Sequence, residues 1–198
     1  MSYKKFNFEK LAQQFGIVQK KQHLFPHLKH EIEGSPVLLR MIEIGMASPI
    51  TTEKAASEAF VYPIMQEIKL RNVDKIELFS GENLDGDKSK ELNGECDFIF
   101  AKAPYAVELK APIITIVEAK QANLDKATAQ AAAQMQGARL FNQKKGTDID
   151  TIYGATTSGT EWLFLKLEGN VIYIDVERYS IQKLPQLLGI LDYIVNLY

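Results

Sequence analysis

Cysteine is nearly absent from this sequence, because Cys96 is the only one among its 198 residues. An internal disulfide and a cysteine-based zinc cluster are therefore excluded, and a lone cysteine fits a reducing compartment. Long apolar runs are missing too: no stretch is long enough to span a membrane, and the first residues lack the apolar segment of a signal peptide. These absences predict a cytoplasmic protein that does not use a membrane as a partner.

An excess of one charge is also lacking. The chain has 23 Lys and Arg against 25 Asp and Glu, which gives a formal net charge of −2. Such a balance does not attract polyanions over the whole surface, so any contact with nucleic acid would need a local basic patch. Hydrophobic residues make up 46% of the chain and charged residues 24%. This composition is typical of a globular protein with a buried core, and a single domain over residues 1–198 is expected.

The first part of the chain, to about residue 72, has helical patterns. Ser35 is placed to cap a helix that has Pro36 at its first position. A second helix is expected to begin at Thr51 or Thr52, and Pro63 should kink or split it. Apolar residues occur all round this second segment, which indicates a helix that is covered on most sides.

The rest of the chain, about residues 73–198, has strand patterns with one long helix between them. Strands are predicted at 75–79, 96–100, 113–120, 151–157, 161–167 and 171–177. The long helix is expected at 123–143 with Asn123 as its cap, and a closing helix at 180–197. This order predicts an α/β (α+β) domain, in which a mixed central sheet is flanked by helices and preceded by a helical N-terminal region.

The segment "IVEAK" ends an apolar strand with two charged residues. Alternation places Ile114, Ile116, Glu118 and Lys120 on one face of that strand. Asp97 lies on the preceding predicted strand, and it can converge with Glu118 if the two strands are neighbours. The simpler alternative is a strand that reaches the surface there, where Glu118 and Lys120 would form an ordinary ion pair.

Two convergent carboxylates raise each other's proton affinity unless a cation neutralises them. Mg²⁺ suits this role, because it prefers oxygen ligands and often binds through one or two carboxylates together with substrate phosphates. A neighbouring lysine such as Lys120 can stabilise the charge that develops on phosphorus. Asp97, Glu118 and Lys120 therefore suggest metal-assisted hydrolysis of a phosphodiester, with Mn²⁺ as the alternative metal.

With these residues, the chain resembles the PD-(D/E)XK, or restriction-endonuclease-like, nucleases, in particular the N-terminal nuclease domain of type I restriction motor subunits. The resemblance covers residues 50–145: a helix acid, "ECDFIFA", "IVEAK" and then a glutamine-bearing helix. It implies a restriction-endonuclease-like sheet, Asp97 and Glu118 as metal ligands, and Lys120 as the catalytic lysine. The family's proline before the aspartate is missing, because Cys96 stands there.

The resemblance also implies an acid from the first helix and a glutamine from the later one. Glu58 is preferred as the helix acid and as a third metal ligand, and Glu67 is the alternative. The two are nine positions apart, so only one of them can face the site. Gln130 would contact the scissile phosphate or a metal-bound water, and Gln134, one turn later on the same face, could substitute for it. The simpler alternatives are a surface glutamate and a well-formed alanine-rich helix.

The expected function is that of a nuclease (a hydrolase) acting on DNA in a restriction- or repair-like setting, with restriction or repair proteins as partners. Lys144 and Lys145, at the end of the long helix, would contact phosphates. A homodimer is suggested by the family and by the apolar C-terminal segment 187–198, unless that segment packs within the chain. The rival functions are an inactive member of the fold that binds nucleic acid or protein, and an unrelated α/β domain.

Three weaker patterns predict no site. His23, His27 and His30 have a zinc-like spacing, but Pro26 interrupts the helix that would align them. The acidic segment 82–95 lacks the glycine and glutamate of a calcium loop and is expected to be a solvated turn. The segment 154–162 has no phosphate-binding lysine after it and is expected to be a hairpin.

Overall fold

The computed structural model describes residues 3–120, 124–147 and 149–198. The helices are α1 (Phe8–Phe15), α2 (Pro36–Met46), α3 (Glu53–Ala56), α4 (Tyr62–Arg71), α5 (Leu124–Lys144) and α6 (Leu184–Val195). Shorter helical turns are η1 (Tyr3–Lys5), η2 (Ser57–Val61), η3 (Lys88–Lys90) and η4 (Ile181–Lys183). The strands are β1 (Val18–Gln22), β2 (Glu77–Asp87), β3 (Leu92–Ala101), β4 (Ile113–Ala119), β5 (Thr151–Thr157), β6 (Glu161–Glu168), β7 (Val171–Asp175) and β8 (Tyr179–Ser180).

These strands form one mixed sheet in the order β1-β7-β6-β5-β4-β3-β2, and β8 pairs with β6. The pairs β1–β7 and β4–β5 are parallel, whereas β2–β3, β3–β4, β5–β6 and β6–β7 are antiparallel. A parallel pair needs a crossover connection, and α5 is the crossover between β4 and β5. The predicted fold class, a mixed sheet flanked by helices, is confirmed.

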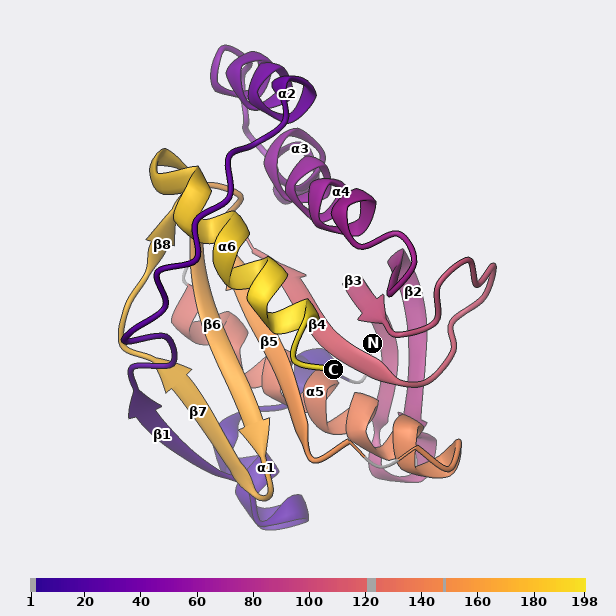
Figure 1. The fold of residues 1–198 in the computed structure, drawn as a ribbon. Coiled ribbons are helices and arrows are strands. Elements are labelled where there is room, and N and C mark those ends of the chain that lie inside the picture. Colours follow the sequence, from indigo (N-terminus) through magenta and orange to yellow (C-terminus); the bar gives the residue numbers. More distant parts are fainter. Residues whose placement is uncertain (1–2, 121–123, 148) are drawn as a thin grey trace.

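Helices cover both faces of the sheet (Figure 1). α4 and α6 pack on one face, in a core cluster that includes Ile64, Leu188 and Phe100. α5 packs on the other face together with η1 and α1, in a second cluster that includes Met135 and Ile116. α2 stands away from the sheet, at the top of Figure 1.

The division into a helical part before residue 72 and a sheet part after it needs a correction. β1 lies at 18–22, inside the part predicted to be helical, and it pairs in parallel with β7. All five of its residues are exposed, so the strand has no apolar face that a sequence pattern could have indicated. Its position depends on backbone hydrogen bonds to β7 at the edge of the sheet.

The predicted helix starts in this region are confirmed. Ser35 Oγ accepts a hydrogen bond from the backbone N–H of Leu38, and Thr52 Oγ1 accepts one from Ala55. Each satisfies a donor that the first helical turn leaves unpaired. The interruption expected at Pro63 takes the form of the π-helical turn η2, which joins α3 to α4. π-helical turns are rare and occur mostly as single turns inserted into α-helices, as here.

The strands and the long helix lie close to their predicted positions, although β2 and β3 extend into the acidic segment that was expected to be only a turn. The cap predicted at Asn123 lies outside the described residues. One face assignment was wrong: Ile114 packs with Val117 on the α6 side, while Ile116 packs on the α5 side. The register between β3 and β4 shifts at this point, because Phe100 pairs with Thr115 but Ala101 pairs with Ile113. A bulge adds one residue and so reverses the side on which Ile114 lies.

α5 lies close to the sheet because glycines meet at its crossing with β2. A Cβ atom added to Gly86 would be 2.5 Å from the backbone of Gly137, which is too close for any side chain. Nearby, the hydroxyl of Tyr3 donates a hydrogen bond to the backbone oxygen of Leu84 and fixes η1 against the same strand. This close approach brings the polar side chains of α5 within reach of β4.

The C-terminal helix packs within the chain. This is the alternative to the dimer interface that the apolar segment 187–198 suggested. Leu187, Leu188, Leu191 and Ile194 of α6 are buried in the core cluster that faces α4. Across the described part of the chain, no helix combines the length and apolar character needed to cross a membrane.

Candidate active site

The ends of β3 and β4 bring Asp97 and Glu118 together. The backbone pairing of these strands extends to Phe98 and Val117, immediately before the two acids. At the next position a side chain replaces the backbone as acceptor: Asp97 Oδ2 accepts a hydrogen bond of 2.7 Å from the backbone N–H of Ala119. The carboxylate of Asp97 is therefore fixed at the end of β4, beside the residue that follows Glu118.

Glu118 is only 1% exposed, and three side chains donate to its carboxylate. Gln130 Nε2 lies 2.5 Å from Oε1, and Gln134 Nε2 lies 2.7 Å from Oε2. Lys120 Nζ lies 2.9 Å from Oε1. Both glutamines come from one face of α5, so the predicted placement of Gln130 at the site is matched by its geometry. Gln134 contacts the second oxygen rather than replacing Gln130.

The two carboxylates affect each other's charge. Burial raises the pKa of Glu118, and the negative charge of Asp97 raises it further, while Lys120 and Gln134 act in the opposite direction. Burial also raises the pKa of Asp97, against the opposing effects of the Ala119 N–H and the Lys120 charge. For Lys120, burial favours the neutral amine, but the Glu118 carboxylate outweighs this and raises the pKa above its ordinary value. Lys120 is thus positively charged at neutral pH.

The helical segment formed by α3, η2 and the start of α4, called the helical wall below, faces these strand ends. It contributes an acid that sequence reasoning missed. Glu53, at the start of α3, places Oε2 3.5 Å from Lys120 Nζ. Glu58, the predicted helix acid, borders the same cleft, but its side chain is 68% exposed and lies 3.8 Å from Lys54. An acid in the first turn of a helix is usually explained by the helix dipole alone, so Glu53 gave no distinct signal.

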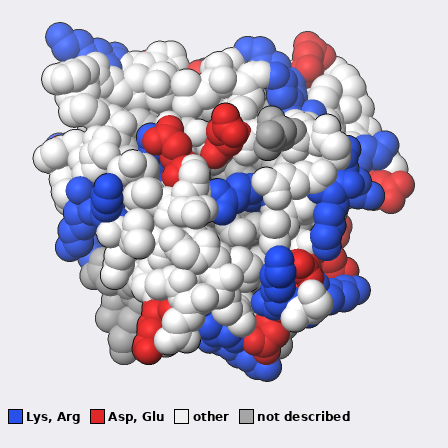
Figure 2. Space-filling model, turned by 90° about the horizontal axis from the view of Figure 1, so that it is seen from below, with Lys and Arg blue, Asp and Glu red and all other residues white. Residues whose placement is uncertain are grey.

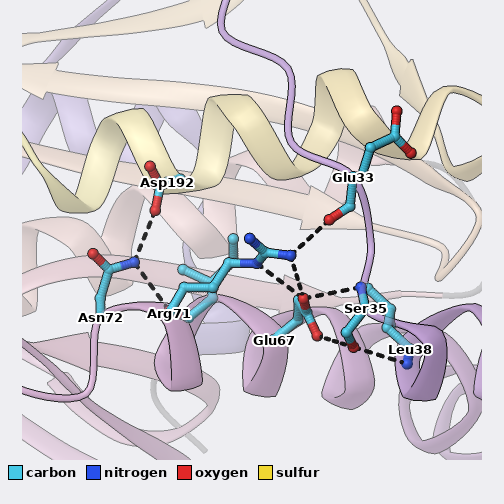
Figure 3. Close-up of polar contacts among 8 residues, drawn as sticks. Glu33, Ser35, Leu38, Glu67, Arg71, Asn72 and Asp192 are labelled. Carbon is cyan, nitrogen blue, oxygen red and sulfur yellow. Dashed lines mark hydrogen bonds and ion pairs between the residues drawn. The ribbon is translucent and has the colours of Figure 1, made fainter.

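Glu67, the alternative helix acid, belongs to a different cluster (Figure 3). Ser35 donates to it twice, from Oγ at 2.6 Å and from the backbone N–H at 3.1 Å. Arg71 Nε donates at 2.9 Å, and the other end of the Arg71 guanidinium donates to the backbone oxygen of Glu33. These bonds hold the start of α2 against the end of α4. Of the two candidates, only Glu58 borders the cleft.

The cleft between the helical wall and the strand ends has a volume of about 620 Å³, a size typical of ligand sites. Its basic side chains are Lys4, Lys54 and Lys120. Tyr62 and Phe98 also line it, with ring centroids 6.4 Å apart. The cleft therefore combines acids, cations and an aromatic surface.

Lys144 and Lys145 lie at the far end of α5 from this cleft. Gln130 and Lys144 are fourteen residues apart on one helix, which corresponds to about 21 Å. Lys145 Nζ lies 5.8 Å from the centre of the Phe141 ring, and the charge of Lys144 acts on Asp87. On the lower face of the molecule, where α5 ends, basic and acidic side chains are interspersed rather than gathered by sign (Figure 2). The structure does not bring these two lysines to the acids.

The donors at the site fit a small hard cation. Within the described ranges, no three His, Cys, Asp or Glu side chains gather as a group that could hold a metal. Asp97 and Glu118 form a pair instead, and Mg²⁺ or Mn²⁺ can bind through two carboxylates when water and phosphate complete its coordination. Burial and the negative charge of Asp97 raise the pKa of Glu118, and a bound cation would oppose both effects by favouring the carboxylate form.

The weaker sequence patterns have ordinary structural explanations. His23 pairs with Glu177 and His30 with Asp192, so these two histidines have separate partners. In the acidic turn, Asp87 accepts hydrogen bonds from the backbone and hydroxyl of Ser89. The segment 154–162 forms the β5–β6 hairpin, as predicted.

The sequence was also compared with known proteins. No protein-family model matches it, and no curated protein matches it either. The assignment to the PD-(D/E)XK nucleases therefore stays a prediction that is based on the residues described above.

Proposed function

We propose that this chain is a metal-dependent nuclease that hydrolyses phosphodiester bonds of DNA, in a restriction- or repair-like role. The observation that carries the proposal is the convergence of Asp97 and Glu118, with Lys120 between the buried Glu118 and the cleft. An ordinary surface ion pair does not require a buried acid, a second acid beside it and two glutamine donors.

Each residue has a distinct part in this proposal. Asp97 and Glu118 would hold Mg²⁺ or Mn²⁺, which would polarise the phosphoryl oxygens and acidify water at the site. Lys120 supplies a fixed positive charge for the negative charge that develops during attack on phosphorus. Gln130 and Gln134 keep Glu118 in one orientation, since each donates to one of its oxygens.

The helical wall would position the lysine and attract the substrate. Glu53 Oε2 contacts Lys120 Nζ from the side opposite the sheet, so the lysine is held between two carboxylates. Lys4 and Lys54 border the cleft and would contact phosphates of the DNA backbone on either side of the scissile bond.

The direct test is incubation of the protein with plasmid and single-stranded DNA in Mg²⁺ or Mn²⁺, with a chelator as control. Wild type should cleave only with the metal, and Asp97→Asn should not cleave. Asp85→Asn is a matched control, because Asp85 is an exposed acid in the β2–β3 hairpin and pairs with Lys88. Absence of cleavage by wild type, or cleavage that survives Asp97→Asn, would overturn the proposal.

A binding module of the same fold is the second candidate, and one observation favours it. Glu118 already has three donors on its two oxygens, so the charged cluster is satisfied without a metal. In that case wild type would bind DNA or a protein without cleaving, and a chelator would leave binding unchanged.

A further inference from the structure

α2 exposes an apolar stripe that the sheet does not cover. Val37, Met41 and Ile44 follow one another at intervals of four and three residues and so share one face of the helix. Val37 is 69% exposed and Ile44 is 53% exposed. The residues that attach α2 to the rest of the chain, Leu38 and Gly45, lie on a different face and are buried. Contiguous apolar surface of this kind marks an interaction site more often than isolated exposed residues do.

The stripe borders a groove between α2 and α4. The two helices run antiparallel, because Ser35 at the start of α2 contacts Glu67 near the end of α4, and Gly45 at the other end of α2 lies against Phe60. The groove has a volume of about 620 Å³. Its apolar lining consists of Val37, Leu38, Met41, Tyr62, Pro63 and Leu70. A groove between two antiparallel helices suits a third helix, which would lie along both of them.

We propose that the apolar stripe of α2, with the groove beside Val37 and Met41, is the interface of a homodimer, in which α2 of a second copy packs antiparallel to α2 about a twofold axis near Met41. The apolar stripe is close to symmetric about that residue. In an antiparallel pair, Val37 therefore meets Ile44 of the second copy, and Met41 meets its counterpart. A twofold interface requires this self-complementary arrangement.

The charges of α2 favour the same arrangement. Arg40 and Glu43 are the charged residues of α2; both are exposed beside the stripe, and they form an ion pair of 2.7 Å with each other within the helix. Antiparallel packing about Met41 places Arg40 of each copy beside Glu43 of the other, so that two equivalent ion pairs form. Parallel packing about a twofold axis would instead place the charged flanks of the two copies on opposite sides of the contact, so that these ion pairs would not form.

The interface is independent of the proposed chemistry, and its test is the oligomeric state without DNA or metal. Sedimentation over protein concentrations up to about 100 µM should show a monomer and a dimer in equilibrium. Ile44→Glu should weaken the dimer by about tenfold or more, because it places a carboxylate in the apolar contact. Met46→Glu is the matched control on the same helix: Met46 is also exposed, but it borders a different hollow beside Ile50 and Ser158.

Charge exchange tests the antiparallel register without altering the apolar stripe. Arg40→Glu and Glu43→Arg should each dimerise more weakly alone, because each places like charges together across the axis. An equimolar mixture of the two variants should form heterodimers, and the variant with both exchanges should dimerise like wild type. A monomeric wild type, assemblies larger than a dimer, equal effects of Ile44→Glu and Met46→Glu, or no recovery in the mixture would each overturn the proposal.

Discussion

The ammonium nitrogen of Lys120 lies 2.9 Å from Oε1 of Glu118, a carboxylate that is almost wholly buried. The same nitrogen is 3.5 Å from Oε2 of Glu53 on the helical wall. Lys120 thus joins the sheet to the helix at the mouth of the cleft. Burial of the Glu118 charge is tolerable because it is paired and hydrogen-bonded on both oxygens.

Lys120→Ala should separate metal binding from chemistry. Removing a positive charge beside Asp97 and Glu118 should leave Mg²⁺ affinity unchanged or slightly higher. Single-turnover cleavage should fall by about a hundredfold or more, as expected when one preorganised electrostatic donor is lost. Metal titration and single-turnover assays are run in parallel, with Lys54→Ala as a control that changes another lysine of the cleft. A full cleavage rate in Lys120→Ala would show that the lysine is not catalytic.

Asp97→Asn should weaken binding of Mg²⁺ or Mn²⁺, because it removes formal charge from a site that must offset a strongly hydrated cation. The asparagine oxygen can still accept the hydrogen bond from Ala119, so the strand ends should keep their geometry. Calorimetry measures the affinity, and Asp85→Asn is the control for loss of an acid elsewhere. Metal binding equal to that of wild type would show that Asp97 is not a ligand.

Much of the site could be predicted from local sequence periodicity. Alternation along β4 put Glu118 and Lys120 on one face, and helix periodicity put Gln130 and Gln134 on one face of α5. These two pairings hold in the structure, because the strand beyond its bulge and the helix are both regular at these positions. The α+β fold class followed in the same way from the order of strand-like and helix-like segments.

Contacts between distant elements could not be predicted this way. Glu53 reaches Lys120 only because α3 is packed across the strand ends, and nothing local distinguishes it from an acid at any helix start. β1 has no apolar alternation, because all five of its residues are exposed, and it joins the sheet through backbone pairing with β7. Ile114 changed faces through a bulge that depends on the register with β3.

The choice of helix acid leads to a comparative prediction. Glu53→Gln should lower the cleavage rate more than Glu58→Gln, because Glu53 contacts Lys120 whereas Glu58 pairs with the exposed Lys54. Both substitutions keep the size of the side chain and remove one charge, so each is the control for the other. Cleavage assays at saturating Mg²⁺ would measure the difference. A larger loss in Glu58→Gln would restore the original assignment of Glu58 as the acting acid.

The position of the cleft also predicts that two pairs of lysines contribute unequally to DNA binding. Replacing Lys4 and Lys54 by glutamate should reduce the slope of log K against log salt by about 1.8 for duplex DNA, the value for two lost phosphate contacts. Replacing Lys144 and Lys145 should have a smaller effect, because these residues lie about 21 Å along α5 from Gln130. Titrations of DNA binding at several salt concentrations in a chelator would measure both slopes. A greater change for the second pair would place the DNA on the other end of α5.

Glu67 provides a prediction about stability and pH. Burial raises its pKa, but the hydrogen bonds from Ser35 and Arg71 outweigh this, so the pKa lies below its ordinary value of 4.5. A lowered pKa means that the unfolded chain binds more protons, so this group stabilises the fold above pH 4.5 and loses that effect as the pH falls. Glu67→Gln should therefore lower the free energy of unfolding by about 1.5–3 kcal/mol at pH 7, the range for hydrogen bonds to a charged group. The difference from wild type should shrink as the pH falls below 4.5, because Glu67 then becomes protonated in wild type. Urea unfolding at several pH values measures this difference in free energy, and Glu82→Gln, which changes an exposed acid, is the control. A difference independent of pH would show that the Glu67 charge does not stabilise the junction of α2 and α4.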